Sequence, residues 1–251
     1  MVKSRIVKSE PALILEGEKK YLVITDLHIG FENEFATNKI ELGKNSSINE
    51  TIKKLKKLIK IEKPESTILL GDIKSSINRI SDTEWKEIPH FFEAIKKETN
   101  LILVPGNHDA NIQHLTPHDV TVTNSIGLVI EDTLLTHGHT LPTKNFSNVK
   151  KIIMGHIHPV FFNNSSLLNG ERVWISLKAR KEQIFPSTDS EIEITIMPSF
   201  NPYFYATQKK FYKKSISPII HKLKSVTEAK IVTLDGAIIG NESMLEDLLF
   251  S

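Results

Sequence analysis

The sequence contains no cysteine among its 251 residues. This absence excludes disulfide bonds, thiolate ligands for a metal ion and a cysteine nucleophile. Long apolar runs are also missing: none approaches the roughly 20 residues of a membrane-spanning helix, and residues 1–20 lack the apolar segment of a signal peptide. We therefore expect a protein that is not inserted in a membrane and that acts in the cytoplasm.

A large excess of charge of one sign is absent as well. The net charge is +2, with 39% hydrophobic and 25% charged residues, which is typical of ordinary globular proteins. So small a charge gives no argument by itself for binding to nucleic acid. The chain has no internal repeat and no low-complexity linker, so we expect a single domain over residues 1–251.

The order of the predicted elements indicates an α/β fold. In the first half, short apolar runs alternate with amphipathic segments, which predicts strands and helices in turn. The predicted strands lie at 21–26, 66–72 and 101–104, and the predicted helices at 46–64 and 81–100. This alternation implies parallel pairing of strands. The second half reads mainly as strands, so we expect two sheets packed face to face with helices outside.

Several apolar runs end in side chains of the kinds that bind metal ions. These side chains are Asp26, His28, Asp72, Asn107, His108, Asp109, His137, His139, His156 and His158. In open sheets with parallel strands, ligands bind beyond the carboxyl ends of the strands. Residues two apart on a strand also point the same way, so the D-x-H and H-x-H pairs can each direct two ligands to one place. Imidazole, carboxylate and amide donors suit hard to borderline divalent metals.

Each of these segments also has a simpler structural interpretation. Gly71-Asp72 alone is typical of a turn, Asn107 can adopt a left-handed turn conformation, and His137–His139 can form the polar end of a hairpin. The joint occurrence of five such segments, each at the end of a predicted strand, favours a common metal site.

In this order, the motifs resemble those of the calcineurin-like metallophosphoesterase superfamily. Its pattern is D-x-H, G-D, G-N-H-D/E, a single H after a strand, and G-H-x-H, and all of it is present between residues 26 and 158. The segments "DLHIGFE", "THGHTLP", "GHIHP" and "MPSFNP" are further similar to the ICC-like phosphoesterases, which are related to the DNA-ligase-associated phosphoesterases. One departure is "GDIKS" at Gly71–Ser75, where that group is expected to have "GDLKH". The missing histidine affects substrate contacts rather than metal ligands.

The resemblance implies a four-layer αββα sandwich of two mixed β-sheets flanked by helices. It also implies two divalent metal ions, with manganese as the first choice and iron, zinc, nickel or cobalt as alternatives. The implied ligands are Asp26, His28 and His158 for the first metal, Asn107, His137 and His156 for the second, and Asp72 as the bridge. The implied reaction is hydrolysis of a phosphodiester or phosphomonoester by a hydroxide that bridges the metals.

Residues beside these ligands are expected to assist the reaction. His108 would protonate the leaving oxygen, and Asp109 would accept a hydrogen bond from the far nitrogen of that ring. His139 would lie next to His137 and contact substrate, and Arg180 would bind phosphate because arginine suits its geometry.

The identity of the phosphoester remains open at the level of sequence, and nucleotides and nucleic acids are among the alternatives. Residues 203–214 mix aromatic residues with lysines, which can stack on bases. We favour the simpler interpretation of a packed aromatic edge with solvated lysines. A phosphodiesterase or phosphatase is the first hypothesis, a DNA or RNA nuclease the second, and a catalytically silent binding or scaffold protein the third. The sequence carries no signal for an oligomeric state.

Overall fold

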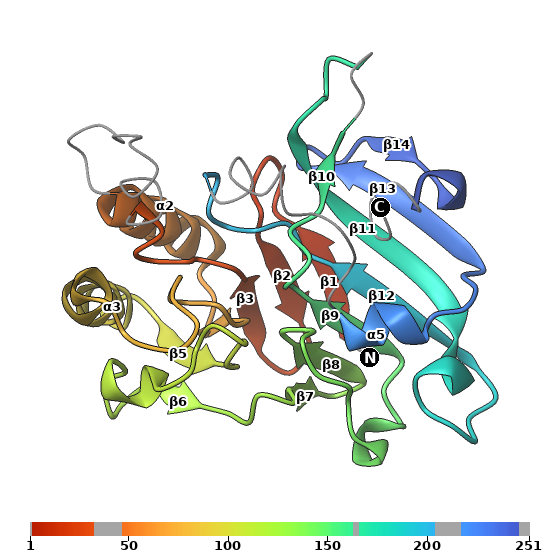
Figure 1. Cartoon of the computed structure of the whole chain (residues 1–251), viewed down its shortest axis with the longest axis horizontal. Helices are drawn as coiled ribbons and strands as arrows, with labels where there is room; N and C mark the ends of the chain where they lie inside the picture. The colour runs from red at the N-terminus through yellow and green to blue at the C-terminus, as the bar shows by residue number, and fades with distance from the viewer. Residues whose placement is uncertain (1, 33–46, 163–165, 204–216, 246–251) are drawn as a thin grey trace.

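The computed structural model describes residues 2–32, 47–162, 166–203 and 217–245. Its first half forms a six-stranded mixed sheet (Figure 1). In spatial order the strands are β1 (Lys3–Ile6), β2 (Leu13–Glu16), β3 (Lys20–Ile24), β4 (Ser66–Leu69), β5 (Asn100–Leu103) and β6 (Thr121–Val122). The strands from β3 to β6 pair in parallel, as the alternation of strands and helices predicts.

The second half forms a mixed sheet of eight strands, which confirms its mainly β character. Its order is β14 (Ile238–Gly240), β13 (Glu228–Thr233), β11 (Glu171–Arg180), β12 (Glu191–Ile196), β9 (Lys151–Met154), β8 (Thr133–Thr136) and β7 (Leu128–Ile130), with β10 (Val160–Phe161) paired to β11. Strands β8, β9 and β12 run in parallel. The carboxyl ends of β8 and β9 therefore lie at one edge of this sheet.

The two sheets pack face to face through one apolar layer. Alternate side chains of β2, such as Leu13 and Leu15, are buried together with Trp174 and Met197 of the second sheet. Ile14, between them in sequence, instead belongs to the core beneath the helices. This follows from the two-residue period of a strand, which sends successive side chains to opposite faces.

Helices complete the outer layers. Helix α2 (Ser47–Glu62) and helix α3 (Asp82–Ile95) pack on the outer face of the six-stranded sheet (Figure 1). A capping box between Ser81 and Glu84 begins α3, and such a cap stabilises a helix by about 1 kcal/mol. The short helix α5 (Pro218–Lys222) packs against the second sheet. Over the described residues, the predicted αββα sandwich is thus confirmed.

Short 3₁₀ turns connect these elements: η1 (Ile112–His114), η2 (Lys144–Phe146), η3 (Lys181–Gln183) and η4 (Glu242–Met244). In the described part of the chain, no helix combines the length and apolar character needed to cross a membrane. Residues 204–214 of the predicted aromatic edge lie outside the described residues.

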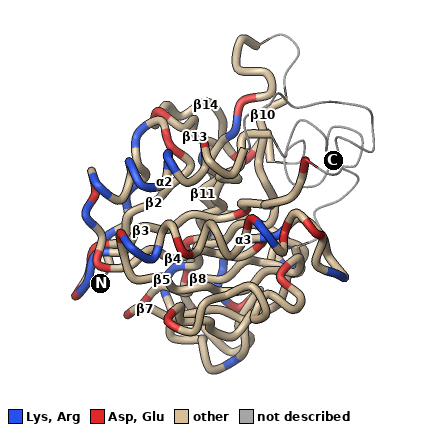
Figure 2. Tube along the Cα trace, turned by 90° about the vertical axis from the view of Figure 1, so that its left-hand side faces the viewer, with Lys and Arg blue, Asp and Glu red and all other residues tan. Residues whose placement is uncertain are grey.

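Charged residues of both signs are interspersed over the surface (Figure 2). Helix α2 illustrates this, because Lys54 forms an ion pair with Glu10 at 2.6 Å and Lys56 forms one with Glu98 at 3.0 Å. The opposite face of α2 is apolar and buried. The lysines of this helix therefore lie on a solvated face, as predicted from the sequence.

Candidate metal centre

The polar side chains predicted from the sequence gather where the carboxyl ends of strands from both sheets meet. The loop after β3 carries Asp26 and His28, the loop after β4 carries Asp72, and the loop after β5 carries Asn107 and His108. From the second sheet, His137 follows β8, and His156 and His158 follow β9. The described residues include three groups in which one donor atom from each side chain lies within 4.8 Å of the donor atoms of the other two. The groups are Asp26, His28 and His158; His28, Asp72 and His108; and Asp72, His137 and His156.

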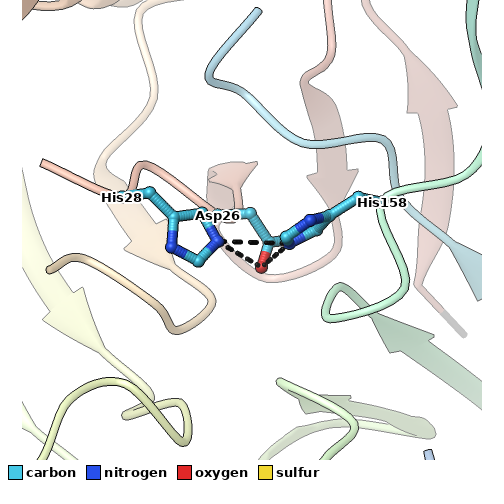
Figure 3. A group of neighbouring side chains, drawn as sticks. All are labelled: Asp26, His28 and His158. Atoms are coloured by element: carbon cyan, nitrogen blue, oxygen red, sulfur yellow. Dashed lines mark hydrogen bonds and ion pairs between the residues drawn. The ribbon is translucent and has the colours of Figure 1, made fainter. Parts of the chain in front are cut away.

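In the first of these groups, Asp26 lies between two histidines (Figure 3). Its Oδ1 is 2.9 Å from Nε2 of His158 and 4.0 Å from Nε2 of His28. The two histidine Nε2 atoms are 3.2 Å apart. Three donor atoms from both sheets thus converge on one point, and all three side chains are buried.

Asp72 connects the remaining groups. Its Oδ2 is 3.2 Å from Nε2 of His137 and 3.8 Å from Nε2 of both His28 and His108. Asp72 is 2% exposed, so its carboxylate meets imidazoles from both sheets in a region that excludes bulk water. A carboxylate has two oxygens, and Oδ1 accepts the backbone N–H of His108 at 2.9 Å.

Several buried donor atoms at this site lack a hydrogen-bond partner within the described residues. Among them are Oδ1 of Asn107 and Nε2 of His156, which form no ion pair in the described structure either. Buried polar atoms are normally hydrogen-bonded, and exceptions require an explanation such as a bound ion. An amide oxygen, carboxylates and imidazoles without sulfur form a donor set that fits divalent metals such as manganese or zinc.

Neighbouring groups orient the donors. Nδ1 of His137 lies 2.9 Å from the carbonyl of Leu70, and because a carbonyl only accepts, Nδ1 donates and Nε2 faces Asp72. Oδ2 of Asp26 accepts the hydroxyl of Thr25 at 2.8 Å and the backbone N–H of His156 at 3.2 Å, which leaves Oδ1 toward the histidines. Such outer contacts fix the tautomer and orientation of metal ligands.

The loops that carry these side chains have an unusual backbone. Positive φ angles occur at Asp26 (57°), His28 (45°), Asp72 (52°), His156 (70°) and His158 (49°). A left-handed conformation costs roughly 1–2 kcal/mol at a non-glycine residue, and such conformations cluster at functional sites. Close packing adds a second constraint, because a Cβ at Gly106 would lie 2.1 Å from Oδ1 of Asp72. Glycine is therefore required in the "GNHD" turn.

Burial and neighbouring charges shift the pKa values in opposite directions. Burial lowers the pKa of His156 to about 3. Burial also disfavours the charged form of His137, but the carboxylates of Asp72 and Asp26 outweigh it and raise the pKa of His137 to about 10. For Asp26, burial favours the neutral acid, but His158 outweighs this effect and lowers the pKa to about 2. Without a bound cation, the proton on His137 supplies positive charge between two carboxylates.

The contacts of His108 differ from the prediction. Nδ1 of His108 contacts the backbone carbonyl of Ser75, not the carboxylate of Asp109. Both oxygens of Asp109 accept backbone N–H groups instead: Oδ2 from Gly106 at 2.8 Å, and Oδ1 from Ile73 at 2.8 Å. Asp109 therefore ties the turn after β5 to the turn after β4. This corrects the expectation that Asp109 holds the ring of His108.

The two predicted substrate residues have different locations. The ring of His139 is 5.4 Å from that of His137 and 6.1 Å from that of His156, so His139 lies beside the group that includes Asp72. Its Nδ1 is buried and lacks a hydrogen-bond partner in the described structure.

Arg180 is not near this group, so the structure does not bring this predicted phosphate-binding residue together with the other site residues. In the strand register, Arg180 lies opposite Glu191 at the start of β12. Ile196, at the other end of β12, lies opposite Met154, shortly before His156. The side chain of Arg180 is 72% exposed and forms an ion pair with Glu182 at 3.3 Å. It therefore lies at the opposite end of the sheet from the histidines.

Sequence reasoning missed residues that hold the loop after β3. Ser199 donates its hydroxyl to the carbonyl of Asp26 at 2.9 Å, and the amide of Asn201 donates to the carbonyl of Leu27 at 2.9 Å. Both residues belong to the segment "MPSFNP", which contributed to the family resemblance but was given no role in the site. These contacts anchor the segment that carries Asp26 and His28.

The arrangement of fold and site agrees with comparisons with known proteins. A family model described as calcineurin-like phosphoesterase matches residues 19–181, a range that includes the grouped aspartates and histidines and the "GNHD" turn. The chain belongs to the calcineurin-like phosphoesterase family and so to the hydrolases that act on ester bonds. Comparison with curated proteins found no match.

Among the solved structures that are similar to this chain are the following two. The first is nuclease MPE from Pseudomonas putida, with a TM-score of 0.54, 16% sequence identity, and coverage of 94% of this chain and 100% of that chain. The second is YfcE, a phosphoesterase from E. coli, with a TM-score of 0.40, 14% identity, and coverage of 88% of this chain and 97% of that chain. At 16% identity, the similarity to the first structure supports the fold.

Proposed function

We propose that this protein is a phosphodiesterase or phosphatase that uses two divalent metal ions. Asp26, His28 and His158 would hold one ion, Asn107, His137 and His156 would hold the other, and Asp72 would contact both. The observation that carries the proposal is the location of Asp72, whose Oδ2 lies 3.2 Å from His137 and 3.8 Å from His28. One carboxylate is therefore within reach of donors from both proposed sets.

Manganese is the metal that we test first, because carboxylate, amide and imidazole donors accept it and no thiolate competes. When bound, the two ions would neutralise charge on the phosphate oxygens and make a water molecule a better nucleophile. The amide of Asn107 adds a neutral oxygen donor, so the ligand set carries only the two carboxylates of Asp26 and Asp72. This limits the repulsion of an anionic substrate.

His108 is the proposed proton donor. Its side chain is 17% exposed, so it borders both the buried ligands and solvent, and Nε2 lies 3.8 Å from Asp72. The proton on Nε2 would pass to the ester oxygen as the bond from phosphorus to that oxygen breaks. General acid catalysis of this kind contributes about 10²–10⁴-fold to a rate.

Hydrolysis of bis(p-nitrophenyl) phosphate tests the proposal. Protein stripped of metal should be inactive, and turnover should appear when Mn²⁺, Ni²⁺ or Zn²⁺ is added back. The variant His108→Ala should bind metal but lose most turnover. If two ions bind per chain and neither this diester nor p-nitrophenyl phosphate is hydrolysed with any metal, the proposal is wrong. The third hypothesis, a catalytically silent binding or scaffold protein, would then explain the data better.

A nuclease is the second candidate. The specific observation in its favour is that the similarity in fold to nuclease MPE extends over 94% of this chain. Metal-dependent cleavage of labelled single-stranded and double-stranded DNA tests it, together with the dependence of DNA binding on salt, which should be steep if phosphates are bound by cationic side chains. Efficient hydrolysis of small diesters with no cleavage of either DNA or RNA would exclude it.

We further propose that residues 1–251 form a single domain in either case. The apolar layer between the sheets supports this, because it combines side chains from both halves of the chain, for example Val23 and Ile68 with Leu135 and Ile153. Single, cooperative thermal unfolding of the intact protein is expected.

A further inference from the structure

Lys74 is completely buried, although its side chain ends in an ammonium group. Its Nζ donates to the backbone carbonyls of Ser76, Ile77 (3.2 Å) and Arg79 (3.4 Å). Burying a charged group is unfavourable unless hydrogen bonds compensate it. The three carbonyls belong to residues two, three and five positions after Lys74, so the ammonium group fixes the course of this turn.

Other contacts hold the start of the same turn. The N–H of Ser75 donates to the carbonyl of Ile29 at 3.0 Å, and the N–H of Ser76 donates to the carboxylate of Glu84 at 2.7 Å. The backbone N–H of Lys74 donates to Asp109 at 3.3 Å. The peptide group between Ser75 and Ser76 is thereby held from both sides, and this peptide group contains the carbonyl that contacts His108.

That carbonyl determines which nitrogen of His108 can exchange a proton. A carbonyl oxygen only accepts hydrogen bonds, so Nδ1 of His108, which contacts the carbonyl of Ser75, must carry a proton. Nε2 then holds the exchangeable proton, and it is the nitrogen that faces Asp72. The contact with Ser75 thus performs the orienting function that the sequence assigned to Asp109. Because the contact uses the backbone, it does not depend on the side chain at position 75.

We infer that Lys74 is a positioning residue: its buried ammonium group holds the Ser75 carbonyl against Nδ1 of His108 and so keeps Nε2 directed at the reacting phosphoester. The inference rests on the proposed acid role of His108. In this role, Lys74 contacts neither substrate nor metal. Removal of the ammonium group should therefore weaken proton donation and leave metal binding intact.

The test compares two esters that differ in their need for an acid. Diphenyl phosphate has a more basic leaving group than bis(p-nitrophenyl) phosphate, so its hydrolysis depends more on protonation. In the metal-loaded protein, Lys74→Met should lower kcat for diphenyl phosphate by about 10–100-fold, the usual effect of losing an outer contact of a site. The loss for bis(p-nitrophenyl) phosphate should be much smaller, and metal content should not change.

A double-mutant cycle and a matched control separate positioning from general destabilisation. In the His108→Ala background, Lys74→Met should cause no further loss of kcat, because residues that act through each other are not additive. Lys181 offers the control: it is also buried, at 6% exposure, and it lies next to Arg180, away from the histidines. Lys181→Met should leave the ratio of the two kcat values unchanged. Equal losses for both esters, or additive losses in the cycle, would overturn the inference.

A measurement on the wild-type protein covers the case in which Lys74→Met does not fold. Nitrogen-15 NMR of the zinc-loaded protein, with the His108 signals identified by their absence in His108→Ala, should show a protonated Nδ1. An unprotonated Nδ1 would overturn the inference. If His108→Ala keeps full turnover on diphenyl phosphate, the acid role itself is wrong, whereas the NMR result still decides whether the Ser75 carbonyl orients the ring.

Discussion

The two sheets bring different kinds of side chain to the edge at which they meet. The six-stranded sheet carries the anionic and amide donors, Asp26, Asp72 and Asn107, together with His28 and His108. Among the described residues of these groups, the eight-stranded sheet contributes the imidazoles of His137, His156 and His158. Negative charge thus comes from one sheet, and the second sheet contributes donors that are neutral or positive.

This division makes each half of the site depend on the other. Asp26 and Asp72 are buried, and a buried carboxylate is unfavourable unless positive charge compensates it. Without metal, His137 of the second sheet supplies that charge, and its raised pKa reflects the interaction with Asp72 and Asp26. With metal, cations would take over this function and would connect the two sheets. The following predictions test this dependence in order of decreasing effect.

The largest effect is expected for Asp72→Asn, which removes negative charge from the first sheet at the proposed meeting point of both ligand sets. Metal content measured by elemental analysis should fall from two ions per chain to one or fewer, and turnover should fall to background. Asp119→Asn is the matched control, because the side chain of Asp119 is 63% exposed and pairs with Lys96 rather than with the grouped histidines. Retention of two ions in Asp72→Asn would show that Asp72 does not bridge.

His108→Ala should have the next largest effect. This histidine belongs to the first sheet but is proposed to act on the substrate, so metal content should remain at two ions. Turnover of diphenyl phosphate should fall about 10²–10⁴-fold, the usual contribution of a general acid. Loss of metal in this variant would instead make His108 a ligand, consistent with its grouping with His28 and Asp72.

Most of this arrangement could be predicted from the sequence because the relevant signals are local. The apolar runs before Asp26, Asp72 and His137 gave the strands, and the polar residues that follow them gave the site. The error about Asp109 has a physical cause: adjacency in sequence places Asp109 near His108, but its carboxylate satisfies backbone N–H groups of two turns. Only tertiary structure brings the Ser75 carbonyl to the ring.

Removal of metal should produce the third effect, on stability. If cations connect the sheets, a chelator should lower the melting temperature. One ion at 100 times its dissociation constant stabilises a protein by about 2.7 kcal/mol, which corresponds to roughly 5–10 °C for a chain of this size. Differential scanning calorimetry with and without added Mn²⁺ measures the shift. In Asp72→Asn the shift should shrink or disappear, and an equal shift in that variant would break the proposed connection.

The pH dependence of metal binding should give a smaller and graded effect. With a pKa of about 10 in the metal-free protein, His137 is protonated at neutral pH, so a metal ion must displace that proton. Affinity should therefore rise with pH, by about tenfold per unit for one displaced proton, and this rise should continue toward pH 10. Calorimetric titration with Mn²⁺ between pH 6.5 and 8.5, in buffers of different ionisation enthalpy, measures the released proton. A flat profile would mean that the second sheet does not supply the compensating charge.

The smallest effect is expected for Arg180→Ala, which tests whether the far end of the second sheet takes part at all. The side chain of Arg180 is largely exposed and pairs only with the neighbouring Glu182 among the contacts of the described residues. Because Arg180 lies at the opposite end of β12 from the histidines, kcat and KM for both esters should change less than about twofold. Exposed substitutions of this kind also change stability by no more than about 0.5 kcal/mol. A large rise in KM with unchanged kcat would mean that substrate reaches this end of the molecule. Such a result would require a substrate long enough to extend from His137 along the full length of β12, which a nucleic acid could do and a small ester could not.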